Sequence, residues 1–159
     1  MNKIPFAAHG TAYIAVYIKP KEGNIMDATD FKVDTGADMT TISKKDLVDI
    51  GFNKDWIIKN AKRKSDSVMT TATGDTVNAF YIQLPLINVL GYEARNWPLA
   101  ILIEDSWDKD FKNLLGRDLL SGFNYKFNNI QDLLEIERNP TFRKRYNFLE
   151  NQEINVIEI

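Results

Sequence analysis

Residues 31–43 read Phe-Lys-Val-Asp-Thr-Gly-Ala-Asp-Met-Thr-Thr-Ile-Ser, and they depart further from an ordinary β pattern than any other stretch of the chain. Segment 29–34 predicts a strand that delivers Asp34 at its end, after which Thr35 and Gly36 turn the chain. An acid buried at a strand end is costly unless another group shares its charge or proton. Asp34 is therefore the first candidate for a catalytic residue, and an ordinary turn is the alternative interpretation.

A second pattern follows late in the chain, where residues 114–118 read Leu-Leu-Gly-Arg-Asp. An Asp-Thr-Gly triplet alone is weak evidence, but here an apolar residue precedes it and Ala37 and Asp38 follow it. Together the two patterns resemble the retropepsin family of single-domain aspartic proteases, over residues 13–127. The resemblance implies an all-β fold, a retropepsin-like closed β barrel with one or two short helices and a C-terminal extension.

The resemblance also implies roles for the residues around Asp34. Thr35 is expected to hydrogen-bond across a two-fold axis, and Gly36 to let the backbone approach both Asp34 and a substrate strand. Asp38 and Arg117 are expected to form a buried ion pair that fixes the loop to the following helix. Truncation of a buried Arg117 would cost about 3 to 5 kcal/mol, because it leaves an uncompensated acid.

A hairpin in the middle of the chain is the candidate lid. The β-rich segments 67–72 and 76–84 are joined by Thr73-Gly74-Asp75, and glycine provides the positive φ that a tight turn needs. This hairpin resembles the flap that closes over substrate in the family, although an ordinary hairpin turn remains an equal alternative. The expected substrate-binding residues are Gly36, Ala37, Asp38, Ala72, Thr73 and Gly74.

The chemistry of an aspartic protease predicts a homodimer. Peptide hydrolysis of this kind needs two carboxylates that share one proton, and the chain holds no second Asp-Thr-Gly and no Asp-Ser-Gly. The second carboxylate would then be Asp34 of another copy, across a two-fold axis. The expected partners are a second copy and a protein or peptide substrate.

Composition excludes several other classes of protein. The chain has 159 residues, 44% of them hydrophobic, which is enough for one compact core. Twenty Lys and Arg against 22 Asp and Glu give a net charge of −2, which disfavours a nucleic-acid partner. There is no cysteine, so disulfides, thiolate metal sites and Cys–His pairs are excluded, and with His9 as the one histidine a Ser–His nucleophile pair would need improbable geometry.

Metal and membrane functions are likewise not expected. Asp105, Asp108 and Asp110 lie in one polar loop, but the loop lacks the glycine and terminal glutamate of a calcium-binding EF-hand. No stretch approaches the ~20 apolar residues that span a bilayer. We therefore expect no metal, no cofactor, no membrane contact and a cytoplasmic location.

The remaining segments predict a mostly β chain with short helices. Ser43 is a typical helix N-cap, and Gly51 ends that helix. Asn128-Asn129 predicts a hairpin turn, while a helix over 130–138 is an alternative there. Further strands are predicted over 11–19, 86–90, 93–103, 124–127, 133–137 and 154–159, and helices over 117–123 and from Asn139-Pro140 through Phe142, Tyr146 and Leu149. We predict a protease domain over 1–128 and an extension over 129–159, whose apolar terminal strand is expected to join the dimer interface.

The sequence thus predicts a homodimeric aspartic endopeptidase that acts through a water held between two copies of Asp34. One alternative is a catalytically silent retropepsin-like domain that binds peptides or assembles with a partner, because a fold can outlive its activity. Another is an unrelated β barrel whose Asp34 only ends a strand, which would be a stable monomer.

Overall fold

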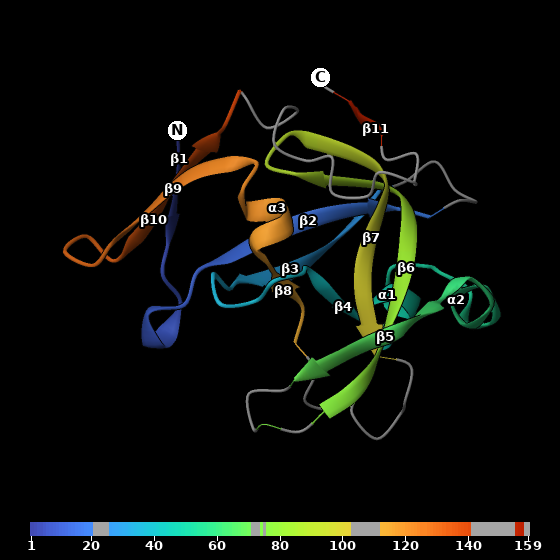
Figure 1. Cartoon of the computed structure of the whole chain (residues 1–159). Coiled ribbons are helices and arrows are strands. Elements are labelled where there is room, and N and C mark those ends of the chain that lie inside the picture. Colours follow the sequence, from blue (N-terminus) through green and yellow to red (C-terminus); the bar gives the residue numbers. More distant parts are fainter. Residues whose placement is uncertain (21–25, 71–73, 75, 103–111, 141–154, 158–159) are drawn as a thin grey trace.

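The computed structural model describes residues 1–20, 26–70, 74, 76–102, 112–140 and 155–157 (Figure 1). Strands dominate and the helices are short, so the predicted all-β class is confirmed. The strands are β1 (Asn2–Pro5), β2 (Tyr13–Lys19), β3 (Asp27–Val33), β4 (Thr41–Ser43), β5 (Lys62–Thr70), β6 (Thr76–Val89), β7 (Tyr92–Leu102), β8 (Leu114–Leu115), β9 (Phe123–Asn128), β10 (Leu133–Arg138) and β11 (Asn155–Ile157).

Eight strands form one large sheet in the order β11-β7-β4-β8-β3-β2-β6-β5. A further ladder joins β6 to β7, so strands near the two ends of this order also pair with each other. β2 shows that the sheet has one buried face. Ile14, Val16 and Ile18 are buried, while Tyr13 and Tyr17 on the opposite face are exposed. This alternation has the two-residue period of a strand with one buried face, as the sequence predicts.

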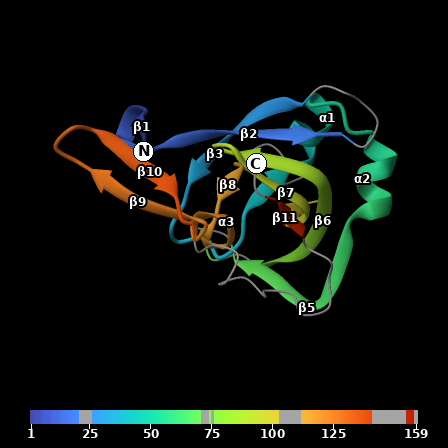
Figure 2. The same cartoon turned by 90° about the horizontal axis from the view of Figure 1, so that it is seen from above.

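The small sheet has the order β1-β10-β9 and lies to one side of the large one (Figures 1 and 2). β9 and β10 form the hairpin predicted around Asn128-Asn129, so the alternative helix over 130–138 is wrong. The first strand, β1, adds to the other edge of β10 and was not predicted. The predicted domain boundary at 128–129 lies in the turn between β9 and β10, which share one sheet.

The helices are η1 (Ala8–Gly10), α1 (Lys44–Asp49), α2 (Lys54–Asn60) and α3 (Arg117–Leu120). Ser43 caps α1 as predicted, because its Oγ accepts a hydrogen bond from the Asp46 N–H at 3.0 Å. α2 was not predicted, although Asn53 is a typical N-cap whose side chain accepts hydrogen bonds from the Asp55 and Trp56 N–H groups. The described part of the chain therefore has more helices than the one or two expected.

Two further predictions differ from the structure or lie outside it. The segments predicted separately over 76–84 and 86–90 form one strand, β6, which continues through Pro85. The predicted helix through Phe142, Tyr146 and Leu149 lies outside the described residues, as do Asp105, Asp108 and Asp110. In the described residues, no helix has both the length and the apolar character needed to cross a membrane.

Candidate active site

Asp34 lies directly after β3, where that strand runs parallel to β8. Val33 is opposite Leu115 in this ladder, and the Asp34 N–H donates to the Leu115 carbonyl at 3.1 Å. The half-buried Asp34 carboxylate accepts a hydrogen bond from the Gly36 N–H at 2.9 Å through Oδ1. The two sequence patterns, far apart in the chain, therefore meet at the base of one loop.

Gly36 lies so close to this carboxylate that a side chain would press on it. A Cβ built on Gly36 would lie 3.2 Å from Asp34 Oδ1, which is tighter than most real Cβ contacts. The Ala37 N–H also donates to the Asp34 carbonyl, at 3.2 Å. These contacts make residues 34–37 a tight turn that fixes the direction of the carboxylate.

The start of α3 closes over the far side of the same loop. The Arg117 N–H donates to the Ala37 carbonyl at 2.8 Å, and the Asp118 N–H donates to the Asp38 carbonyl at 3.2 Å. A Cβ on Gly116 would lie 2.5 Å from the Met39 carbonyl carbon, closer than real structures allow. Gly116 is therefore required where α3 meets the loop, because no other residue fits between the two backbones.

The expected ion pair between Asp38 and Arg117 is present but not buried. Arg117 Nη2 contacts Asp38 Oδ1, while 59% of the arginine side chain and 79% of the aspartate side chain are exposed in the single chain. The prediction of a buried pair is wrong for this chain by itself. Exposed ion pairs contribute about 0 to 1 kcal/mol, well below the value expected for a buried pair.

The buried acid at this place is Asp118, the next residue along α3. Its Oδ1 accepts from the Thr40 N–H at 2.8 Å and from the Thr40 hydroxyl at 2.6 Å, and its Oδ2 accepts from Trp97 Nε1 at 3.3 Å. Burial raises the pKa of the Asp118 carboxyl above its ordinary value of 3.8, and the hydrogen bonds from Thr40 and Trp97 oppose that rise. The Thr40 hydroxyl in turn accepts from the Gly116 N–H at 3.1 Å, which completes a network under the active loop.

Comparison with known proteins agrees with this arrangement. The family described as gag-polyprotein putative aspartyl protease matches residues 24–122, a span that includes both the Asp34 loop and the start of α3. The chain belongs to this retropepsin-like family. A retropepsin-like aspartic protease from Rickettsia conorii has a similar solved structure, with a TM-score of 0.59, 26% identity, and coverage of 84% of this chain and 86% of that one. No curated protein matches the sequence.

In this retropepsin-like chain the candidate lid is a real hairpin. β5 pairs antiparallel with β6, with Thr70 opposite Thr76 and Val68 opposite Asn78. Gly74 is exposed and has a φ of +87°, as the turn requires. Ala72 and Thr73 lie outside the described residues, so their expected contact with substrate stays a prediction.

Other site predictions depend on groups that a single chain does not contain. Thr35 is exposed beside Asp34, and its expected hydrogen bond across a two-fold axis stays a prediction.

Among the described residues, no three His, Asp or Glu side chains gather as metal ligands would. The buried Asp118 is not among the predicted site residues, because its partners Thr40 and Trp97 are too distant in sequence to form a local pattern.

Proposed function

We propose that the chain is an aspartic endopeptidase whose active form is a homodimer with one Asp34 from each subunit. The observation that carries the proposal is the fixed Asp34 carboxylate, which a hydrogen bond from Gly36 holds in a loop clamped by β8 and α3. We also interpret the pairing of β6 with β7 as the closure of a β barrel that keeps this loop rigid.

Two such carboxylates side by side can do the required chemistry. Like charges a few ångströms apart do not both ionise readily, so the pair holds one proton between them at mildly acidic pH. The ionised Asp34 accepts a proton from water as the water attacks the peptide carbonyl, and the protonated Asp34 donates to the carbonyl oxygen. One copy alone supplies only half of this pair.

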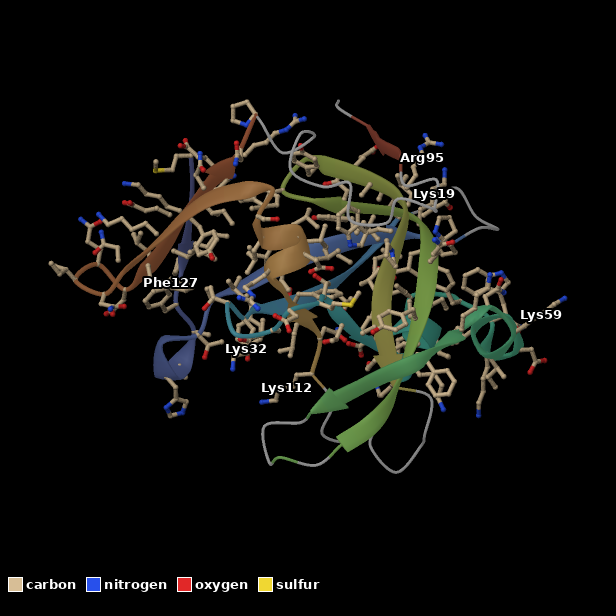
Figure 3. All side chains as sticks on the ribbon, viewed as in Figure 1. Lys19, Lys32, Lys59, Arg95, Lys112 and Phe127 are labelled. Carbon is tan, nitrogen blue, oxygen red and sulfur yellow. The ribbon has the colours of Figure 1, made fainter. Side chains whose placement is uncertain are left out.

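The open edge of β9 is the surface that we assign to the second copy. Within the described part of the chain, β9 pairs with β10 alone. Tyr125 and Phe127 on this strand are each 37% exposed and contact each other edge-on, with ring centroids 6.1 Å apart. Figure 3 shows Phe127 on this small sheet, away from the larger one. An unpaired edge that carries exposed aromatic rings favours pairing with another strand.

Symmetry and charge select one register for that pairing. In a two-fold antiparallel pair of the six-residue β9 strands, the two registers with the greatest overlap place either Tyr125 or Lys126 opposite its own copy. A Lys126 pair would place like charges opposite each other, which is destabilising. With Tyr125 at the centre, Phe123 instead faces Phe127 of the second copy and Lys126 faces Asn124. The terminal strand β11, in contrast, pairs with β7 of its own chain, so its expected place in the interface stays a prediction.

Because the chain has no native cysteine, single cysteines report this register cleanly. Tyr125→Cys should form a disulfide-linked dimer on mild oxidation, visible on a non-reducing gel. Phe127→Cys on the same face should not, because four strand positions place its two copies about 13 Å apart along the strands. Cross-linking by Phe127→Cys or Lys126→Cys in place of Tyr125→Cys would contradict the register.

Catalysis is tested by Asp34→Asn, which keeps the shape and the acceptor oxygen for Gly36. The unmodified protein should cleave an unstructured protein such as reduced casein at mildly acidic pH, and Asp34→Asn should abolish cleavage while the sedimentation profile is unchanged. Asp30→Asn on the exposed part of β3 is the matched control and should leave cleavage intact. Equal cleavage by Asp34→Asn would refute the proposal, and peptide binding without cleavage by the unmodified dimer would favour the silent-domain alternative.

A further inference from the structure

A second concave site lies away from Asp34, between α2 and the ladder of β6 with β7. It is an open groove of about 350 Å³, within the size range of small-ligand sites. α2 provides Trp56 and Asn60, β6 provides Tyr81, Gln83 and Pro85, and neither Asp34 nor its loop lines the groove.

The apolar part of the groove consists of rings. Pro98 at the base is buried, while Trp56, Tyr81 and Pro85 are half-buried and so present part of each ring to solvent. Trp56 is held in place by Phe52, with ring centroids 5.2 Å apart. The groove therefore offers fixed aromatic and proline surfaces.

The backbone beside the groove is irregular, which is a second and independent observation. The β6–β7 ladder passes from Leu84–Trp97 to Leu86–Arg95 without a shift of register, but Pro85 and Asn96, which lie opposite each other between these pairs, are not paired. Proline has no N–H to donate, and Asn96 adopts a φ of +53° inside a strand. Strained backbone of this kind is maintained only where the surrounding structure enforces it, and it concentrates at ligand sites.

The polar part of the groove is made of side-chain amides. Asn60 and Asn96 add amides to that of Gln83, and among the described residues that line the groove Lys62 is the one that carries a charge. Amides both donate to and accept from peptide groups, whereas a phosphate ligand would need more positive charge. A polyproline-II segment fits this lining. Its prolines can pack on the rings, and its peptide carbonyls, which make no internal hydrogen bonds, can accept from the side-chain amides.

We propose that this groove binds an extended, proline-containing segment of polypeptide. The site is independent of the proposed protease activity, because it shares no residue with the Asp34 loop. It lies at the base of the β5–β6 hairpin, where its lining residues Lys62 and Tyr81 pair with each other.

The binding test uses the full chain with Asp34→Asn, so that no cleavage can occur. ¹⁵N-labelled protein is titrated with a capped hexaproline peptide, and a capped Gly-Ser peptide of equal length is the control. The proposal predicts saturable shifts of the Trp56 indole N–H and of the Asn60 and Asn96 side-chain amides with hexaproline alone. Shifts centred on residues 34–38, equal shifts with the Gly-Ser peptide, or no shifts at millimolar peptide would overturn it.

Variants locate the site. Asn96→Gly accepts the positive φ and removes the amide, so it should fold normally and weaken hexaproline binding about fivefold. Trp56→Leu should weaken it about tenfold or more, since aromatic anchors dominate such sites. Ile58→Ala changes an exposed residue of α2 outside the groove and should bind as before. Unchanged affinity in both groove variants, or binding of cellohexaose in place of hexaproline, would show that the proposed occupant is wrong.

Discussion

Two acids lie where the start of α3 meets the Asp34 loop, and one is exposed while the other is buried. Asp38 pairs with Arg117 in solvent, while Asp118, the next residue along the helix, is buried against Thr40 and Trp97. The ion pair is the contact that the family pattern emphasises, yet the acid with more hydrogen bonds is the buried Asp118. The loop that carries Asp34 is therefore fixed mainly by the neutral donors to Asp118 and by backbone contacts.

The largest expected loss of stability is at Gly116, where the backbone at the start of α3 contacts the backbone of the Asp34 loop. Gly116→Ala places a Cβ against the Met39 carbonyl and Thr40 N, neither of which can move without displacing the active loop. We expect a loss of more than about 4 kcal/mol in the free energy of unfolding, measured by urea denaturation. Gly91→Ala, at a turn with open space but positive φ, is the control for simple glycine loss and should cost about 1 kcal/mol. Equal losses in both variants would show that the close approach at Gly116 is unimportant.

Removal of the buried acid should have the next largest effect. Asp118→Ala leaves the Thr40 N–H, the Thr40 hydroxyl and Trp97 Nε1 without their acceptor, so about 3 kcal/mol should be lost. Asp118→Asn keeps an acceptor oxygen and should recover more than half of that loss. A destabilisation of less than about 1 kcal/mol by Asp118→Ala would contradict the assigned network.

The pH dependence of stability separates the two acids further. Because the pKa of Asp118 is raised in the folded protein, folding is favoured when this carboxyl is protonated. Its contribution is fully present below the ordinary value of 3.8 and is lost as pH rises through the higher folded value. Relative to Asp118→Asn, the unmodified protein should therefore gain stability as pH falls toward 3.8, in urea unfolding series. A constant difference between the two proteins across that window would contradict the raised pKa.

The smallest effect is expected at the exposed ion pair. Arg117→Ala should change the free energy of unfolding by at most about 1 kcal/mol, because solvent screens the pair. Asp38→Asn should behave alike, and the double variant should reveal a coupling energy of similarly small size in a double-mutant cycle. A loss of 3 kcal/mol or more in the dimeric protein, but not under monomeric conditions, would show that dimerisation buries the pair.

Much of the fold and part of the candidate active site could be predicted from the sequence. The alternation in β2, the cap at Ser43 and the turn at Asn128-Asn129 are local signals, and each predicted its element. The meeting of Asp34 with Leu115 followed from the family pattern, because the two segments are distant in the chain. A local signal for α2 is also present in the sequence, because Asn53 is a typical helix N-cap.

Burial at α3 was not predictable in the same way. Arg117 and Asp118 are neighbours in a four-residue helix, too short for a periodic pattern to separate its buried and exposed sides. Which of the two lies inside depends on Trp97 and Thr40, which only the folded sheet brings to that place. The same holds for β6, which continues through Pro85 because of its long ladder with β7.

A mixing experiment tests the two-Asp34 active site most directly. Unmodified and Asp34→Asn chains are unfolded together in equal amounts, refolded, and assayed for cleavage of an unstructured protein at constant total concentration. If each active unit needs Asp34 from both subunits, only dimers of two unmodified chains cut, and activity falls to about a quarter. A fall to only about half would mean that each chain acts through its own Asp34, which would contradict the proposed mechanism.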